Sequence, residues 1–221
     1  MKRAYGLDVP ETLSEALDPD RTALIVYDMQ VGIMRQLQHA AAITAKVGEV
    51  LAAARDAGIR TYFLRHTSLP KNLMGVFQFR QALAWQRKTS IDEIHPWFLR
   101  GSEAHEIVPE LAPRDNEAVF DKIGMSAFEG TPLDTALRDC GIRSFLIAGV
   151  AIEIGIEPTV RQGADLGYIP LVVEDACGAG HEEAGKRAIA SLRYMGDAIV
   201  TNVAEVASLL RDRRASTGES A

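Results

Sequence analysis

Short apolar runs alternate with longer segments of helical periodicity along most of the chain. The apolar runs have the length of buried strands and lie at 22–27, 60–64, 118–120, 144–149, 169–173 and 198–200. Between them, helices are predicted at 39–57, 131–140, 181–195 and 203–211. The first helix, for example, has Ile43, Val47 and Leu51 on one face and ends at Gly58, a common residue after a helix.

Apolar strands that alternate with helices are typical of a parallel sheet covered on both faces. Right-handed crossovers then bring the helices onto both sides of the sheet. The pattern therefore predicts an α/β fold: a three-layer, doubly wound, Rossmann-like arrangement of a mostly parallel six-stranded sheet with helices on both faces. We expect one domain over residues 1–212 and a flexible tail over 213–221, which is small and polar.

The segment 67–114 interrupts this alternation. Aromatic and basic side chains are concentrated in it: Phe77, Phe79, Arg80, Trp85, Arg87, Lys88, Trp97, Phe98 and Arg100. Long insertions on a rigid scaffold are commonly binding elements or lids. Packing against the sheet edge and a subunit interface are the alternatives. As a binding element, the insert would offer Trp97 and either Arg80 or Arg87 to an anionic substrate.

Composition and charge narrow the classes of partner. The 221 residues carry a net charge of -6, which does not favour nucleic acid or anionic membranes as partners. No window approaches the roughly 20 apolar residues of a membrane span, and the first eight residues lack the apolar core of a signal peptide. The two cysteines, Cys140 and Cys177, have no disulfide or metal spacing. We therefore expect a cytoplasmic protein whose partner is a small molecule.

Candidate chemistry follows the predicted strands. Asp28, Lys122 and Gly155 come just after three of them, and the carboxyl ends of parallel strands gather at one edge, where ligands bind. Each also has an ordinary interpretation, since an Asp there is often a helix cap and a lone Lys is usually solvated. His66 lies at another strand end and either lines the pocket or packs beneath it.

Four stretches together resemble the isochorismatase-like hydrolases. They are 27–30 (Tyr-Asp-Met-Gln), 121–131 (with Lys, Ser-Ala-Phe and Thr), 149–161 (starting Gly-Val) and 172–177 (Val-Val-Glu-Asp-Ala-Cys). The resemblance implies that Asp28 is the acid/base and that Gln30, in the same motif, contacts the substrate. It also implies that Lys122 is the catalytic lysine, which orients the substrate and tunes Asp28. It also implies a cis peptide between Val150 and Ala151, N–H groups near Ala151 and Gly155 that hold an oxygen, and a homodimer or homotetramer.

Two positions depart from the usual family pattern. Most members have the nucleophilic Cys where this chain has Gly155, and Glu153 replaces an amide or small polar residue. Glu153 either favours the start of its helix or activates water. Neither Cys140 nor Cys177 is placed to replace the thiol. The histidines do not form the metal cluster of the nicotinamidase branch, and Gly178–Gly180 lacks a dinucleotide fingerprint. We expect no metal and no cofactor.

Three functions remain open. The first is a thiol-independent hydrolase that uses acid/base chemistry on a small, carboxylated substrate such as an enol ether. The second is an amide hydrolase that uses directly activated water, with Asp28 or Glu153 as base. The third is a binding protein that kept the pocket without the reaction.

Overall fold

Six parallel strands form the centre of the protein, for which the computed structural model describes residues 1–218. They are β3 (Thr22–Tyr27), β4 (Arg60–His66), β5 (Ala118–Lys122), β6 (Ser144–Val150), β7 (Ile169–Gly178) and β8 (Ile199–Thr201). Their order across the sheet is β5-β4-β3-β6-β7-β8. The predicted six-stranded α/β fold is confirmed, and within the described residues every pair in this sheet is parallel.

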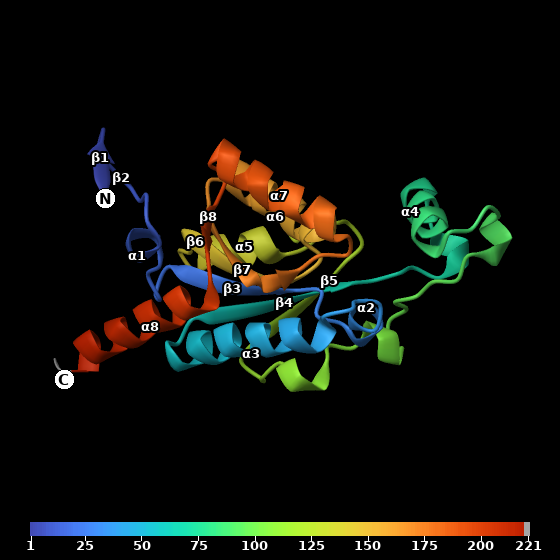
Figure 1. Cartoon of the computed structure of the whole chain (residues 1–221), viewed down its shortest axis with the longest axis horizontal. Helices are drawn as coiled ribbons and strands as arrows, with labels where there is room; N and C mark the ends of the chain where they lie inside the picture. Colours follow the sequence, from blue (N-terminus) through green and yellow to red (C-terminus); the bar gives the residue numbers. More distant parts are fainter. Residues whose placement is uncertain (219–221) are drawn as a thin grey trace.

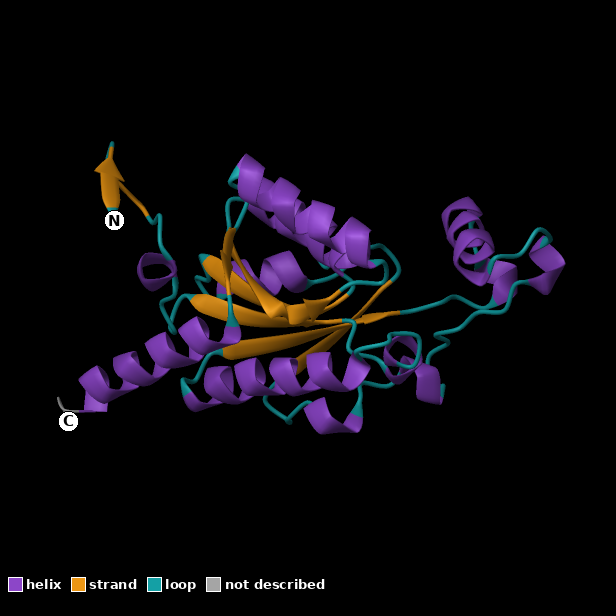
Figure 2. Ribbon diagram, in the orientation of Figure 1, coloured by secondary structure: helices purple, strands orange, loops and turns teal. Residues whose placement is uncertain are grey.

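Helices cover both faces of this sheet (Figures 1 and 2). One layer holds α3 (Ala40–Asp56) and α8 (Val203–Gly218), and the other holds α5 (Leu133–Asp139), α6 (Glu157–Asp165) and α7 (Glu182–Met195). Strand side chains alternate between the two layers. In β3, Leu24 and Val26 join the core under α3, while Ile25 and Tyr27 join the core under α5, α6 and α7.

The direction in which successive strands are added to the sheet reverses beside β3. The chain runs outward from β3 to β4 and β5, then returns to the other side of β3 as β6. Tyr27 and Gly149 are therefore register partners at the carboxyl ends of β3 and β6. Gly149 has φ 133°, and a Cβ there would lie 2.0 Å from the carbonyl oxygen of Tyr27, so this close approach requires glycine. Open α/β sheets bind ligands at such a switch point.

Shorter elements project from the layered body. An antiparallel hairpin of β1 (Lys2–Ala4) and β2 (Leu7–Val9) precedes α1 (Leu13–Ala16), and α2 (Val31–Met34) follows β3. The insert contains α4 (Val76–Gln86) and short 3-10 turns at Lys71–Leu73, Ile91–Glu93, Glu103–His105 and Pro109–Leu111. Figure 1 shows α4 beyond the sheet, at the opposite end of the long axis from both termini.

The C-terminal segment differs from the sequence prediction. We expected a tail from Arg213 onward, but α8 continues to Gly218; residues 219–221 lie outside the described residues. The first part of α8 is anchored in the core by Val206 and Leu210, and the helix then continues into the polar segment.

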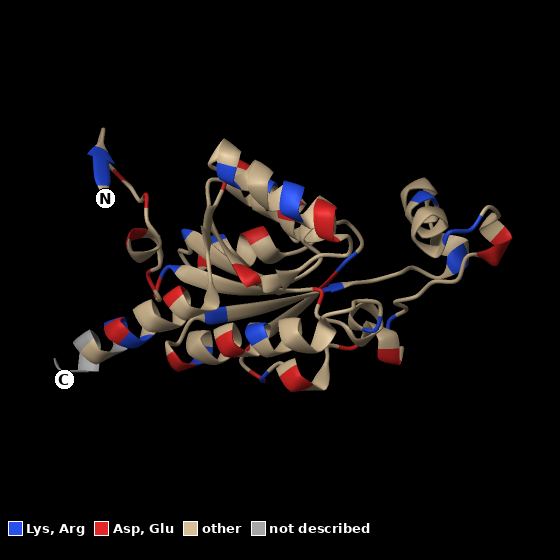
Figure 3. Cartoon of the chain, in the orientation of Figure 1, with Lys and Arg blue, Asp and Glu red and all other residues tan. Residues whose placement is uncertain are grey.

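Between residues 1 and 218, no helix is both long and apolar enough to cross a membrane. Basic and acidic residues are interspersed over the helices (Figure 3).

Candidate active site

Asp28 and Lys122 meet at the carboxyl edge of the sheet. Asp28 directly follows β3 and has φ 50°, a left-handed conformation that Asp tolerates better than most residues. Lys122 is the last residue of β5, two strands away. Its Nζ donates a hydrogen bond to Asp28 Oδ2 over 2.8 Å, and both side chains are buried. The parallel topology thus brings these two sequence candidates together.

The pair is electrostatically suited to moving a proton. Burial raises the pKa of Asp28 to about 6, and the neighbouring Lys122 ammonium limits this rise. Burial also lowers the pKa of Lys122, which its pairing with Asp28 opposes. Asp28 Oδ1 is buried and has no hydrogen-bond partner among the described residues. A carboxyl group in this state can accept or donate a proton near neutral pH.

A cavity of 390 Å³ opens beside Asp28. Most of the predicted site residues line it: Asp28, His66, Arg87, Trp97, Val150, Ala151 and Glu153. The sequence pattern did not indicate four other lining side chains, Ile33, Leu37, Met125 and Ile154. The cavity is also lined by Trp85 and Phe98. Trp85 and Phe98 were part of the aromatic signal of the insert. The cavity has the size of a small-molecule site with an apolar wall and a few polar groups.

Lys122 acts on this cavity through Asp28. It is 2% exposed and lies behind Asp28, outside the described cavity wall. Besides Asp28, its Nζ donates to the Gly124 carbonyl oxygen over 3.4 Å and lies 4.3 Å from the ring centroid of Tyr27. The structure therefore places Lys122 where it tunes Asp28, and corrects the expectation that it orients the substrate directly.

The turn after β6 has an unusual backbone. The Val150–Ala151 peptide bond is cis, as the resemblance implied, and a π-helical turn, Ile152–Ile156, leads into α6. Val150 and Ala151 border the cavity, whereas Gly155 is buried and is not one of the residues that line it. The Gly155 N–H already donates to the Ala151 carbonyl oxygen over 3.0 Å. The expectation that Gly155 offers a free donor to the substrate is therefore wrong, because the turn consumes that N–H.

Glu153 lies in the same turn and reaches the start of α7. Its Oε1 accepts a hydrogen bond from the His181 N–H over 2.7 Å, just before the helix begins. A carboxylate here is stabilised by the N-terminus of α7, and Glu153 also lies in the first turn of its own helical segment, as one of the two interpretations from the sequence expected. Its Oε2 is buried and has no hydrogen-bond partner among the described residues. Glu153 thus combines a structural bond with an acceptor atom next to the cavity.

His66 is a neutral member of the cavity wall. It ends β4, is 7% exposed, and packs edge-on against Trp85 and Phe98 with centroid separations of 6.2 and 5.7 Å. Burial lowers its pKa to about 3, and the charge of Lys122 contributes in the same direction. Its Nδ1 has no partner among the described residues. His66 can therefore offer a neutral imidazole hydrogen bond but no charge.

Gln30 and Arg80 are not in the cavity wall, contrary to the prediction. Gln30 is fully buried: its Nε2 donates to the carbonyl oxygens of His66 and His105, each over 3.0 Å, and its Oε1 accepts from His66 N–H over 2.7 Å. It joins the ends of β3 and β4 to the insert beneath the site. Arg80 is exposed on α4.

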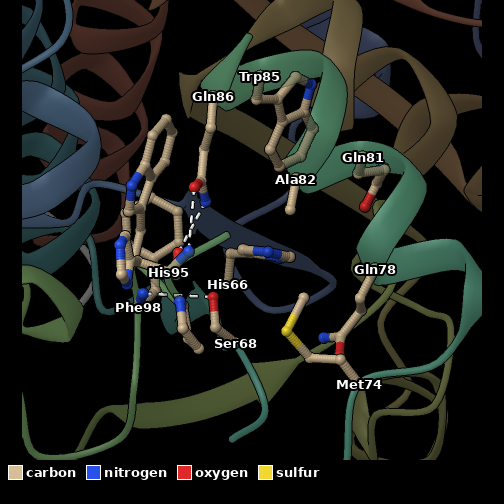
Figure 4. Close-up of a pocket in the computed structure, with 12 residues that line it drawn as sticks. His66, Ser68, Met74, Gln78, Gln81, Ala82, Trp85, Gln86, His95 and Phe98 are labelled. Atoms are coloured by element: carbon tan, nitrogen blue, oxygen red, sulfur yellow. Dashed lines mark hydrogen bonds between the residues drawn. The ribbon is translucent and has the colours of Figure 1, made fainter. Parts of the chain in front are cut away.

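A second, smaller cavity of 30 Å³ lies inside the insert (Figure 4). It shares His66, Trp85, Trp97 and Phe98 with the larger cavity, and its volume fits about one water molecule. In its wall, Gln86 exchanges two hydrogen bonds with the backbone of His95. The larger cavity is therefore the candidate substrate site, and the small one belongs to the packing of the insert.

The insert is thus part of the site. Trp85, Arg87, Trp97 and Phe98 all reach the main cavity from it. Its outer surface carries exposed apolar side chains, including Leu73, Val76 and Phe77. The subunit interface that the sequence left open for this segment stays a prediction.

Neither cysteine is suited to act as a nucleophile in this cavity. Cys140 ends α5 and is exposed, and Cys177 is buried within β7. Burial raises the pKa of Cys177 to about 12, so its thiol stays protonated. Among the residues that the structure describes, no group of His, Cys, Asp and Glu side chains could hold a metal ion.

Known proteins share this sequence and this architecture. The isochorismatase domain model matches residues 22–205. Ureidoacrylate amidohydrolase RutB of Cronobacter sakazakii is 31% identical over 182 residues, which cover 76% of this chain and 78% of that protein. The corresponding enzyme of Pantoea ananatis is 32% identical over 194 residues, with 77% and 75% covered.

Among solved structures, a cysteine hydrolase from Pseudomonas syringae superimposes with a TM-score of 0.78 at 25% identity. The match covers 89% of this chain and 95% of that one. The domain match contains the entire sheet together with Asp28, Lys122 and the turn after β6. The chain therefore belongs to the isochorismatase family and is a hydrolase.

Proposed function

We propose that this hydrolase cleaves a C–N bond in a small carboxylated amide or ureido compound, using a directly activated water and no enzyme thiol. The observation that carries the proposal is Asp28, a buried carboxyl with a pKa near 6 that pairs with Lys122 and borders the cavity. One of its oxygens has no partner within residues that the structure describes. The second support is Gly155. It has no side chain at the position where the resemblance puts the nucleophile.

The reaction needs one proton carrier. The Asp28 carboxylate takes a proton from water as the water oxygen attacks the substrate carbonyl carbon. The negative charge on the carbonyl oxygen is held by the backbone around Ala151, which borders the cavity. Asp28 then gives the proton to the nitrogen as the C–N bond breaks, so that the carboxylate is restored.

The cavity walls match the two ends of such a substrate. Arg87 is a guanidinium on the insert side and suits a carboxylate. Glu153 and Asp28 each have an oxygen without a partner among the described residues, and these acceptors suit N–H groups. A ureido or amide group carries such N–H groups, and the relatives named above are ureidoacrylate amidohydrolases.

Hydrolysis of an enol ether is the second candidate. It needs an acid that protonates carbon before water attacks, and Asp28 is partly protonated at pH 6. In this reaction Asp28 would act first as an acid, whereas in amide hydrolysis it acts first as a base. The two candidates share the site but require opposite protonation states of Asp28 in the free enzyme.

The dependence of kcat/KM on pH distinguishes them. With Asp28 as base, kcat/KM on the substrate should rise tenfold per pH unit below about 6 and level off above it, because only the carboxylate is active. With Asp28 as acid, kcat/KM should fall above about pH 6. The measurement is initial rates from pH 4.5 to 8.5 with ureidoacrylate, a panel of small amides and isochorismate. A profile that falls above pH 6 on an amide would overturn the base assignment.

Activity should not depend on a thiol. The double variant Cys140→Ser/Cys177→Ser and the iodoacetamide-treated protein should keep kcat within about twofold of the untreated protein, because neither thiol borders the cavity. Circular dichroism checks that the fold is intact. Loss of turnover in a folded, alkylated protein would show that a cysteine takes part.

Two arginines of the insert form a matched pair for testing the substrate carboxylate. Arg87→Gln should raise KM about tenfold or more with a smaller effect on kcat, because it removes a charge-assisted bond worth about 1.5–3 kcal/mol. Arg80→Gln should leave KM unchanged, since Arg80 is exposed outside the cavity wall. Equal effects of the two changes on KM would mean that the charge of the whole insert, and not a contact by Arg87, binds the substrate.

The homodimer or homotetramer and the cytoplasmic location stay predictions. Sedimentation velocity of the purified chain and of an Arg80→Gln variant would establish the oligomer and show whether α4 lies in an interface.

A further inference from the structure

The space above Gly155 is already filled by a tyrosine. A Cβ added to Gly155 would lie 1.9 Å from the hydroxyl oxygen of Tyr27 and 2.3 Å from Cζ of its ring, where real Cβ atoms keep at least 3.0 Å. Tyr27 is 1% exposed and lies in the core under α5, α6 and α7, so its ring is surrounded by closely packed side chains. Any side chain at residue 155 therefore competes with Tyr27 for the same volume.

Tyr27 also contacts the parts that form the site. It is the last residue of β3, directly before Asp28. Its hydroxyl donates a hydrogen bond to the Met125 carbonyl oxygen, and Met125 borders the cavity. Lys122 Nζ lies over its ring, 4.3 Å from the ring centroid, and makes a cation–π contact with it. Burial raises the pKa of Tyr27 well above its usual value, so the phenol stays neutral.

We propose that Tyr27 is a positioning residue of this site: its phenol takes the volume of the side chain that residue 155 lacks, and its ring holds Lys122 against Asp28. The shared volume of Tyr27 and residue 155 follows from the packing alone. The role of the ring in holding Lys122 rests on the proposed function, in which Asp28 moves the proton. Tyr27 and Gly155 therefore form one packing unit, in which a larger residue at 155 requires a smaller residue at 27.

A double-mutant cycle on stability tests the shared volume and needs no substrate. Gly155→Ala in the natural background should lower Tm by about 2–12 °C, because the added Cβ overpacks the core. In a Tyr27→Val background, Gly155→Ala should leave Tm unchanged or raise it, since the ring is gone. The matched control is Gly48→Ala in α3, where a Cβ would meet only Leu111 at 3.7 Å; it should have the same effect in both backgrounds. An equal Tm loss from Gly155→Ala in both backgrounds would overturn the shared volume.

Titration of Asp28, followed by carboxyl-carbon NMR, tests the positioning role. Tyr27→Phe keeps the ring and should leave the Asp28 titration where the natural protein has it. Tyr27→Val removes the ring that holds Lys122 in place, and Asp28 should then titrate at a pH higher by at least half a unit, because the opposing ammonium has moved away. A folded Tyr27→Val protein whose Asp28 titrates as in the natural chain would refute the positioning role. This result would leave the proposed reaction untouched, because the pH–rate profile tests that separately.

Discussion

Asp28→Asn should lower kcat by about 10²–10⁴-fold, the usual contribution of a general acid/base. The amide keeps the shape of the side chain and can still accept a hydrogen bond from Lys122, but it cannot take a proton from water or deliver one. Because the loss falls on the chemical step, KM should change much less than kcat. Steady-state rates on the substrate identified by the panel give both quantities.

Stability needs a separate control for this variant. Asp28→Asn leaves the Lys122 ammonium buried without its counter-charge, and the loss of one partner of a buried ion pair is destabilising. The double variant Asp28→Asn/Lys122→Met removes both charges and should regain part of the lost Tm without regaining activity. If Asp28→Asn keeps near-natural kcat, Asp28 is not the acid/base, and the mechanism proposed for this chain is wrong.

The sequence predicts the carboxyl edge of the sheet well because strand order is not needed for it. Asp28 and Lys122 follow apolar runs of the chain, and parallel strands bring all such ends to one edge whatever their order. The same argument predicts the position of His66, which ends β4 between the strands that carry Asp28 and Lys122. The 2.8 Å ion pair and the raised pKa of Asp28 depend on how deeply the edge is buried, and the sequence pattern does not contain that depth.

The insert shows where periodicity stops being informative. Arg80 and Arg87 are seven residues apart, so a continuous helix would place both on one face. In the structure α4 ends at Gln86, and Arg87 takes a left-handed conformation with φ 52°. The chain turns there, so Arg87 reaches the cavity while Arg80 stays on the outside. The helix end carries no glycine or proline that would have indicated it.

Tyr27 and Gly155 illustrate a second limit. In the sequence Tyr27 is an ordinary strand residue and Gly155 is a missing nucleophile, and 128 positions separate the two. Their competition for one volume arises only from the packing of β3 against the turn after β6. The hydrogen bond from the Gly155 N–H to Ala151 is likewise a property of the π-helical turn, which has no sequence signal of its own.

Lys122→Met should destabilise the protein in a strongly pH-dependent way. The folded state holds the Asp28 pKa above its ordinary value of 3.8, so the stability from its protonated form is present at low pH and is lost as pH rises through the folded pKa. Without Lys122, burial acts on Asp28 unopposed, so its pKa moves above about 6 and the loss extends to higher pH.

At pH 5 the Asp28 of Lys122→Met is neutral, and Tm should lie close to that of the natural protein. At pH 8 the buried Asp28 carboxyl, whether protonated or ionised, has lost the ammonium that opposed the effect of burial. Tm should then be lower by about 5–10 °C, because each unit by which its pKa rises costs about 1.4 kcal/mol. Thermal unfolding at pH 5, 6.5 and 8 measures this. The neutral double variant Asp28→Asn/Lys122→Met should lack the extra pH dependence. A Tm loss in Lys122→Met that is equal at all three pH values would assign the role of Lys122 to the packing of its aliphatic chain, and not to the charge that it sets against Asp28.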